Sequence, residues 1–505
     1  MVELVASDFV RQLALISRKF AKIAAALLLV SVVSSCAIYD LFGRSESNRL
    51  HQLVSQNGVL STTLVAQHTK VELGGTILDG MTYNGDFAGP VMRVRQGDVL
   101  KVKLVNHLDQ LTNLHFHGLH TTPLGYSDNV HLTVAPGQSI DYEVPIPVTQ
   151  PPGLYWYHAH IHGISEGQVM GGLSGALVVE GLEARLPALQ GLKENLLVFK
   201  DLTFDDSADP TVSGQWHDRV TSINGLDSLS ISSRPGETQL WRIGNHSANL
   251  PVHIKLTGHK FRVISRDGAI LNQIEEADVL DLNPANRVEV LVTAGQAGQY
   301  EAVATGVPTG VGPSYSLNRR LAVLTVGGDS VTIPVRPSLT EQPDMHAKSI
   351  DARREYAFTQ NVDESKYYLG GRLFDAERVD LRVPLGSVEE WTIRNDTDDL
   401  HAFHIHQVHF QVVEVNGVAQ PFNGYADTVR VPSRGTVKVI LPFTDPAIVG
   451  RFMYHCHVLN HEDHGMMAQI EVYDPAGKVQ AADWISRTIC RKKPELEATW
   501  GQLLL

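Results

Sequence analysis

The sequence predicts an all-β protein built from three consecutive β-sandwich domains. Short runs of alternating apolar and polar residues, such as 99–105, have the period of half-buried strands. The 42 glycines and 24 prolines punctuate these runs, and long amphipathic helical patterns are scarce. One strand pattern also recurs three times along the 505 residues, which indicates repetition of a single β-domain.

The repeat has two elements. The first is a strand pattern that opens on glycine and closes on asparagine, and its copies are residues 97–106, 236–245 and 386–395. In the second, a glycine comes five residues before a fixed position, and the copies are Gly153 with His158, Gly298 with Val303, and Gly450 with His455. Units of this size suit β-sandwiches. The predicted segments are an export signal over 1–35, a linker over 36–60, domains over 61–181, 182–335 and 336–475, and a C-terminal tail over 476–505.

The N-terminal segment has the features of an export signal. Arg18, Lys19 and Lys22 form a positive region, and the apolar stretch that follows is too short to span a bilayer as a helix. It ends in Val-Ser-Ser-Cys, which resembles a bacterial lipobox in which a lipidated Cys36 would tether the protein to a membrane. An ordinary signal peptide with a cysteine near its end is the alternative. Both interpretations predict an exported protein of the periplasm or cell envelope.

Charge and cysteine content exclude two classes of protein. The formal net charge of −13 lacks the basic footprint of a nucleic-acid binder, so we expect no nucleic-acid partner. The three cysteines are too few for a disulfide framework.

Histidine is concentrated in four short motifs, which hold ten of the 23 histidines. Each motif contains a His-x-His pair, and alternate residues of a strand face the same side, so both imidazoles of a pair point together. The pairs occupy the first and third repeats, and the second repeat has lost them. Eight imidazoles are too many for one metal ion and suit a cluster of three ions. The pairs are His115 with His117, His158 with His160, His404 with His406, and His455 with His457.

The last pair encloses a cysteine, Cys456. In an extended strand this cysteine faces away from both neighbours, so one short segment would serve a metal site on each side. A thiolate, an imidazole and a distant thioether form the ligand set of a blue copper centre. His461 and Met466 follow at short range, with Met467 as the alternative axial ligand.

The four motifs, in this order and spacing on a threefold repeat, resemble those of the multicopper oxidases, which include laccases and bacterial cuprous oxidases. The resemblance covers nearly all of residues 60–475. It implies three cupredoxin-like Greek-key domains and four copper ions: one type 1, one type 2 and two type 3. The implied type 1 ligands are His401, Cys456, His461 and Met466; the type 2 ligands are His115 and His404; the type 3 ligands are His117, His158, His160, His406, His455 and His457.

The resemblance also implies that two carboxylates supply protons. Asp128 resembles the acidic residue that the family places beside the type 2 water channel, and Glu462 resembles a proton-relay glutamate of the cuprous oxidases. A solvated loop acid is the alternative for both.

The function implied is one-electron oxidation of a small-molecule reductant coupled to four-electron reduction of O2 to water. We expect a laccase-like oxidase of phenols or aromatic amines, and a periplasmic Cu(I) oxidase for copper tolerance is the alternative. Only eight methionines are present, and none cluster outside 453–467, which argues against a specialised Cu(I) site. The segment 462–467 nevertheless is closer to the cuprous oxidases than to fungal laccases. A copper-free division scaffold and a copper nitrite reductase remain as further alternatives, and the intact set of ligand positions argues against both.

Overall fold

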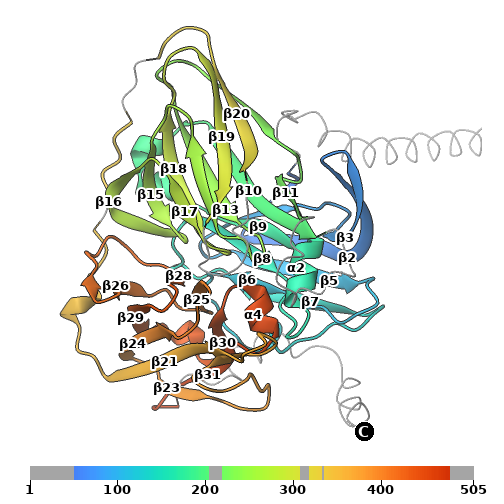
Figure 1. Ribbon diagram of the computed structural model, residues 1–505, viewed down its shortest axis with the longest axis vertical. Helices are drawn as coiled ribbons and strands as arrows, with labels where there is room; N and C mark the ends of the chain where they lie inside the picture. The colour runs from blue at the N-terminus through green and yellow to red at the C-terminus, as the bar shows by residue number, and fades with distance from the viewer. Residues whose placement is uncertain (1–49, 204–218, 308–317, 332–334, 340, 478–505) are drawn as a thin grey trace, which may run out of the picture. The chain divides into compact units, whose positions relative to one another are not determined.

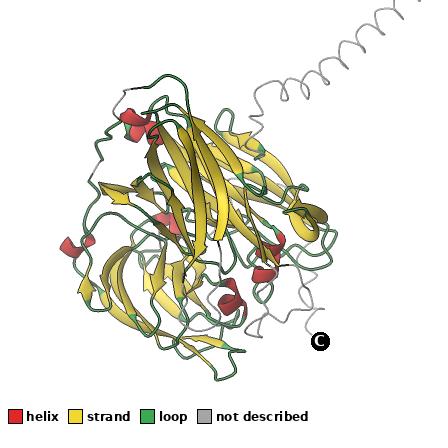
Figure 2. Cartoon of the chain, turned by 45° about the horizontal axis from the view of Figure 1, so that its top comes forward, coloured by secondary structure: helices red, strands yellow, loops and turns green. Residues whose placement is uncertain are grey.

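The computed structural model describes residues 50–203, 219–307, 318–331, 335–339 and 341–477. Strands dominate these residues and helices are few and short (Figure 2), so the all-β prediction is confirmed. The strands form six sheets, labelled by strand in Figure 1, and consecutive pairs of sheets pack into three sandwiches. The predicted export signal, Cys36 and nearly all of the predicted tail lie outside the described residues.

The first sandwich contains a four-stranded and a five-stranded sheet. The four-stranded sheet runs β3 (Thr76–Tyr83), β2 (Val59–Leu73), β5 (Val99–Asn106), β7 (Ser139–Pro145). The five-stranded sheet runs β1 (Gln52–Val54), β4 (Val91–Arg95), β9 (Ser174–Glu180), β8 (Gly153–His158), β6 (His115–His117). Alternate apolar residues of both sheets meet in one buried core around Leu104 and Tyr157. β1 pairs in parallel with β4. It lies in the segment predicted as a linker, and the prediction missed it because three residues are too few to show the alternation of a strand.

The second sandwich contains a six-stranded and a five-stranded sheet. The six-stranded sheet runs β11 (Arg219–Ile223), β10 (Glu194–Thr203), β13 (Thr238–Asn245), β18 (Arg287–Thr293), β15 (Phe261–Arg266), β16 (Ala269–Ala277). The five-stranded sheet runs β12 (Leu229–Ser233), β20 (Asn318–Val326), β19 (Gly298–Gly306), β14 (Val252–Leu256), β17 (Leu280–Leu282). Trp241 and Phe261 are buried in the core between them.

The third sandwich repeats this plan. Its six-stranded sheet runs β22 (Tyr367–Leu369), β21 (Ala352–Gln360), β24 (Ser387–Asn395), β29 (Thr436–Phe443), β26 (Gln411–Val415), β27 (Val418–Ala419). Its five-stranded sheet runs β23 (Leu381–Pro384), β31 (Met467–Tyr473), β30 (Gly450–Cys456), β25 (His401–Ile405), β28 (Thr428–Val431). Trp391, Phe403 and Cys456 share one buried core.

The repeated asparagine closes an equivalent strand in each sandwich. β5, β13 and β24 each pair in parallel with the preceding long strand of their sheet. The side-chain amide of each asparagine then donates to two backbone carbonyls further along the chain. The donor and acceptors are Asn106 with Gln110 and Val134, Asn245 with Leu250 and Leu282, and Asn395 with Asp399 and Val431. A buried amide that ties the strand end to the next loop explains why the sequence repeat closes on this residue.

The helices are short. The α-helices are α2 (Ser165–Gly171), α3 (Leu182–Arg185) and α4 (Leu459–Asp463); the 3-10 helices are η1 (Pro187–Leu189), η3 (Met345–Ala347) and η4 (Pro446–Ile448). Asp463 at the end of α4 accepts the backbone N–H of Ser165 (3.1 Å) and Glu166 (2.7 Å), so α4 of the third sandwich caps α2 of the first. Among the described residues, none of the helices is long and apolar enough to cross a membrane.

Candidate metal centres

Two antiparallel strand pairs bring the eight paired histidines together. In the first sandwich β6 pairs with β8, so His115 lies opposite His158. In the third, β25 pairs with β30, so His404 lies opposite His455. The two strand pairs face each other, since the rings of His115 and His406 stack with their centroids 3.8 Å apart. We call these eight residues the histidine cluster.

Ring nitrogens converge inside the histidine cluster. Nε2 of His455 lies 3.1 Å from Nε2 of His406 and 3.3 Å from Nε2 of His160. The ring of His457 lies beside these groups, with its centroid 5.0 Å from that of His117. Three groups of histidines have ligand atoms within 4.8 Å of one another: His115, His117 and His158; His115, His404 and His406; His160, His406 and His455.

The buried imidazoles have the protonation state that a metal requires. Burial lowers the pKa of His158 to about 3 and of His160 to about 4, so both are neutral at physiological pH. Burial also lowers the pKa well below the ordinary value for His115, His117, His404, His406 and His457. Buried ring nitrogens without a hydrogen-bond partner include Nε2 of His115, His158 and His404 and Nδ1 of His117 and His406. Such groups are costly to bury unless something binds them, so the residues present fit metal ions.

A second group of ligand atoms lies on the other face of β30. Sγ of Cys456 is 3.4 Å from Nδ1 of His401 and 3.7 Å from Nδ1 of His461, and these two nitrogens are 3.0 Å apart. Burial raises the pKa of the Cys456 thiol to about 12, so only a bound cation would keep a thiolate here. We call His401, Cys456, His461 and Met466 the cysteine site.

The two neighbouring methionines pack differently. Met466 belongs to the same buried core cluster as Cys456. Met467 is the first residue of β31 and packs with Val130 and Met453 in a separate cluster. Met466 therefore shares a core with Cys456, whereas Met467 does not.

Hydrogen bonds hold the rings from outside. Nε2 of His401 lies 2.8 Å from Oγ1 of Thr397, whose hydroxyl donates to Oδ1 of Asn395 (2.8 Å). Since that hydroxyl proton is already used, Nε2–H of His401 donates to Thr397 and leaves Nδ1 free to face Cys456.

Both predicted carboxylates are buried beside the histidine cluster. Oδ1 of Asp128 lies 2.9 Å from Nδ1 of His115, and burial raises the pKa of Asp128 to about 8 against the hydrogen bonds from Phe116 and Gln407. Glu462 lies 3.0 Å from Nδ1 of His455 and 3.7 Å from Nδ1 of His160.

The two carboxylates differ in charge. Burial raises the pKa of Glu462, but His160 and His455 lower it further, and the net pKa lies below its ordinary value. Glu462 is therefore ionised at neutral pH, whereas Asp128 holds a proton.

Sequence reasoning missed several residues that hold the rings. Asp427 lies against His117, 310 positions away in the chain, and only the fold brings them together. Thr397 could have been found, because it follows the repeated Asn395 by two residues and Ser247 follows Asn245 in the same way. His120 and His409, which we did not expect as ligands, are hydrogen-bonded to each other in the interior.

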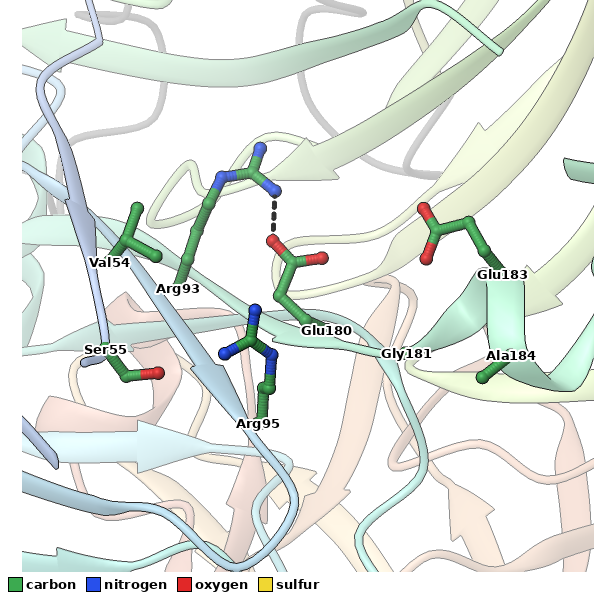
Figure 3. A pocket seen from close by; sticks show the side chains of 8 residues that line it. All are labelled: Val54, Ser55, Arg93, Arg95, Glu180, Gly181, Glu183 and Ala184. Atoms are coloured by element: carbon green, nitrogen blue, oxygen red, sulfur yellow. Dashed lines mark hydrogen bonds and ion pairs between the residues drawn. The ribbon is translucent and has the colours of Figure 1, made fainter. Parts of the chain in front are cut away.

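The polar pocket in Figure 3 contains no residue of either candidate centre. It has a volume of about 350 Å³, and an ion pair of 2.7 Å joins Arg93 to Glu180 inside it. Its lining residues are Val54, Ser55, Arg93, Arg95, Glu180, Gly181, Glu183 and Ala184. Arg93 also forms an ion pair with Glu194 (2.5 Å), so two carboxylates of the protein itself neutralise its charge.

The fold and the two centres define a three-domain, cupredoxin-like protein with histidine-rich metal positions. Three family models, each described as multicopper oxidase, match residues 65–184, 200–328 and 341–476. The chain belongs to the multicopper oxidase family.

The chain is similar to two kinds of curated protein, multicopper oxidases and cell division proteins. The chain is 27% identical over 431 residues to the multicopper oxidase mco of Staphylococcus aureus, covering 82% of this chain and 89% of that protein. It is also 27% identical over 427 residues to the cell division protein FtsP of Edwardsiella tarda, covering 79% and 87%.

Solved structures share the fold. A multicopper oxidase from Campylobacter jejuni, described as a metallo-oxidase, superposes with a TM-score of 0.73 at 25% identity, covering 85% of this chain and 97% of that one. A laccase from Pediococcus acidilactici superposes with a TM-score of 0.73 at 28% identity, covering 86% and 94%.

Proposed function

We propose that this protein is an oxidase that couples the one-electron oxidation of a phenol or aromatic amine to the four-electron reduction of O2 to water. The observation that carries the proposal is the arrangement around β30. His455 and His457 belong to the histidine cluster, and Cys456 between them belongs to the cysteine site. One segment therefore joins two candidate metal centres through a few covalent bonds.

The ligand assignment is the one that the family resemblance implies, and the convergence of these side chains supports it. We assign a type 1 copper to the cysteine site, a type 2 copper to His115 and His404, and a type 3 pair to the six remaining histidines of the cluster. In the second sandwich Ile254 takes the repeat position of His404 and lies opposite Ala304, and Val303 takes the repeat position of His455. Because none of these side chains is a metal ligand, we assign no copper to this sandwich.

When bound, the copper ions would supply the redox chemistry: one centre taking single electrons, the other three together reducing O2. The chain supplies the connection and the surroundings. Cys456 and the backbone of β30 link the centres, and burial of the histidine cluster keeps bulk water from the reacting groups.

Protons for water formation come from the two carboxyls. Asp128, whose pKa burial raises to about 8, can hold a proton beside His115. Ionised Glu462 lies beside His455 and His160, where its carboxylate can accept a proton and pass it to the cluster.

The reductant would approach His461, which is 8% exposed and is the most accessible residue of the cysteine site. Tyr367, which is itself buried, stacks on its ring with centroids 4.3 Å and planes 23° apart and supports the ring from inside. Burial, Asp399 and Glu364 all raise the pKa of Tyr367, so negative charge surrounds this face and favours a neutral or cationic reductant.

The methionines support an organic reductant over Cu(I). Met453 and Met467, the methionines of this segment that are not assigned to the cysteine site, are buried, which removes their thioethers from an incoming ion. The carboxylates around Tyr367 are the observation that favours the alternative, a Cu(I) oxidase, because they attract a cation. Steady-state rates on a simple phenol and on Cu(I), with O2 uptake recorded, separate the two: we expect faster turnover of the phenol.

Substitution of Cys456 by serine tests the proposal itself. Cys456→Ser should remove the blue colour and O2-coupled turnover, and a blue, active variant would overturn it. The copper-free division scaffold, an alternative from the sequence, predicts instead that the purified wild-type protein takes up no copper on loading.

A further inference from the structure

Arg287 connects all three sandwiches through one buried guanidinium. It is the first residue of β18 in the second sandwich, and its side chain has no exposed surface. Nη1 and Nη2 donate to Oδ1 and Oδ2 of Asp427 in the third sandwich at 2.9 and 2.8 Å. Nε donates to the carbonyl of Leu154 in the first sandwich at 3.1 Å. The planar, two-bond geometry fixes the orientation of the carboxylate as well as its charge.

Asp427 in turn lies against His117. Its Oδ1 is 3.1 Å from Nε2 of His117, and both side chains are buried. An ionised carboxylate only accepts hydrogen bonds, so His117 must carry its proton on Nε2. Nδ1 of His117, which has no hydrogen-bond partner, then keeps its lone pair for the histidine cluster.

This orientation is the reverse of that in neighbouring members of the cluster. Nδ1 of His115 faces Asp128, Nδ1 of His158 faces the carbonyl of Ala159, and Nδ1 of His404 faces the carbonyl of Asp427. Each of these three rings leaves Nε2 unpartnered. His117 alone among the four offers Nδ1, and Asp427 is the group that makes the difference.

The backbone next to His117 is shaped around the ion pair. Gly118 has φ +87, and a Cβ there would lie 2.7 Å from both Nη2 of Arg287 and Oδ2 of Asp427. No side chain fits between the pair and the chain at this point. The Arg287–Asp427 pair is therefore in contact with the segment that carries the ligand ring.

We propose that the Arg287–Asp427 pair is a positioning device by which the second sandwich, to which we assign no copper, sets the tautomer and orientation of His117 so that Nδ1 faces the cluster. This inference rests on the proposed function, since it requires copper at the histidine cluster. Arg287 keeps the buried carboxylate ionised and oriented, and Asp427 holds the ring.

Double substitutions separate positioning from stability. Arg287→Met with Asp427→Leu replaces the buried ion pair by apolar groups. Asp267, which lies 3.4 Å from Nη1 of Arg287, keeps its hydrogen bonds from Asn286 and from the backbone N–H of residue 287. We expect this variant to fold and stay blue but to bind copper at the histidine cluster about 10- to 100-fold more weakly, because His117 loses its acceptor. Arg287→Met with Asp427→Asn keeps a neutral acceptor oxygen and should restore binding. The measurements are copper per protein, chelator competition and the blue absorption.

Glu289→Gln is the matched control. Glu289 lies two residues after Arg287 on β18, is equally buried, and accepts the backbone N–H of the same Leu154 whose carbonyl Arg287 binds. It pairs with Arg242 and touches no histidine of the cluster. Its substitution should lower the unfolding temperature and leave copper binding unchanged.

A measurement on the wild-type chain covers the case in which the leucine variant does not fold. In the fully reduced protein with Cu(I) bound, which is diamagnetic, nitrogen-15 histidine NMR should show His117 protonated at Nε2 and His115 protonated at Nδ1. Full copper binding by the leucine variant, or a proton on Nδ1 of His117, overturns the inference. A wild-type protein that takes up no copper overturns the proposed function instead.

Discussion

The backbone amide of Cys456 donates to the carbonyl of Met466 at 3.1 Å, and the amide of Met466 donates to the carbonyl of His461 at 2.9 Å. These two bonds fold the loop between β30 and β31 back on itself, so the thiol, the imidazole and the thioether come from one closed turn. Met467 leaves this turn as the first residue of β31.

Met466→Leu should therefore change the redox behaviour of the blue centre, and Met467→Leu should not. Loss of a weak axial thioether leaves a less electron-rich copper, which raises its reduction potential, by roughly tens of millivolts. Redox titration of the blue absorption measures this for both variants. Equal potentials in the wild type and Met466→Leu would contradict the assignment of the axial ligand.

Thr397→Val should weaken copper binding at the cysteine site about 10- to 100-fold, because His401 loses the oxygen that fixes its ring and tautomer. Chelator competition followed by the blue colour gives the affinity. Thr397→Ser keeps the hydroxyl and serves as the control, with an affinity close to that of the wild type. A valine variant that binds as tightly as the serine variant would show that the hydroxyl has no such role.

Glu462→Gln should slow the oxygen step and spare the electron-accepting step. The amide cannot relay a proton, and losses on the order of 100-fold or more are typical when such a group is removed. Stopped-flow measurements should show normal bleaching of the blue colour by reductant and slow recovery with O2. Glu166→Gln is the control, because Glu166 is a buried carboxylate bonded to Asn249 and Asn460 rather than to a histidine. Recovery at the wild-type rate would exclude Glu462 from proton transfer.

Lys200 predicts a pH dependence of stability. It is fully buried, and its Nζ donates to the carbonyls of Phe87 (2.5 Å) and Gly172 (2.9 Å). Burial lowers the pKa of Lys200 to about 7, whereas the unfolded chain titrates this lysine near its ordinary value of about 10.4. Between these values the unfolded state holds a proton that the folded state has lost, so Lys200 makes stability rise with pH, by up to ~1.4 kcal/mol per pH unit.

Denaturant unfolding from pH 7 to pH 10 compares the wild type with Lys200→Met. As the pH rises, the free energy of unfolding of the wild type should increase relative to that of the Lys200→Met variant. Lys103→Met, at an exposed position of β5, should give a curve parallel to the wild type. A parallel curve for Lys200→Met as well would mean that Lys200 keeps its ordinary pKa when buried.

Local sequence patterns predicted those strands whose residues alternate between buried and exposed positions. The alternation over 99–105 predicted β5, and the repeated asparagine marked the ends of β5, β13 and β24. The same period-two rule places Cys456 on one face of β30 and His455 on the other, which is how the structure has them. β1 was missed because three residues paired in parallel at a sheet edge carry no period.

The partners of the ligand rings could not be predicted in the same way. Asp427 contacts His117 directly, whereas Arg287 and Gln407 act through Asp427 and Asp128. A lone aspartate or arginine in the sequence has no spacing that marks its target. Their positions depend on how the sandwiches pack, which involves contacts hundreds of residues apart. The candidate metal ligands can therefore be predicted from the sequence. The carboxylates that orient those ligands can be found only from the folded structure.

The two candidate centres differ in how much of the chain they need. All four residues of the cysteine site lie between His401 and Met466, whereas the histidine cluster joins His115 to His457. A chain still being synthesised can hold no complete cluster until β30 of the last sandwich has emerged and docked on the first. Metal binding at the cluster would then occur only after folding is complete, because it needs ligands from both the first and the third sandwich. A chain truncated before β30 would lack two of these ligands, His455 and His457.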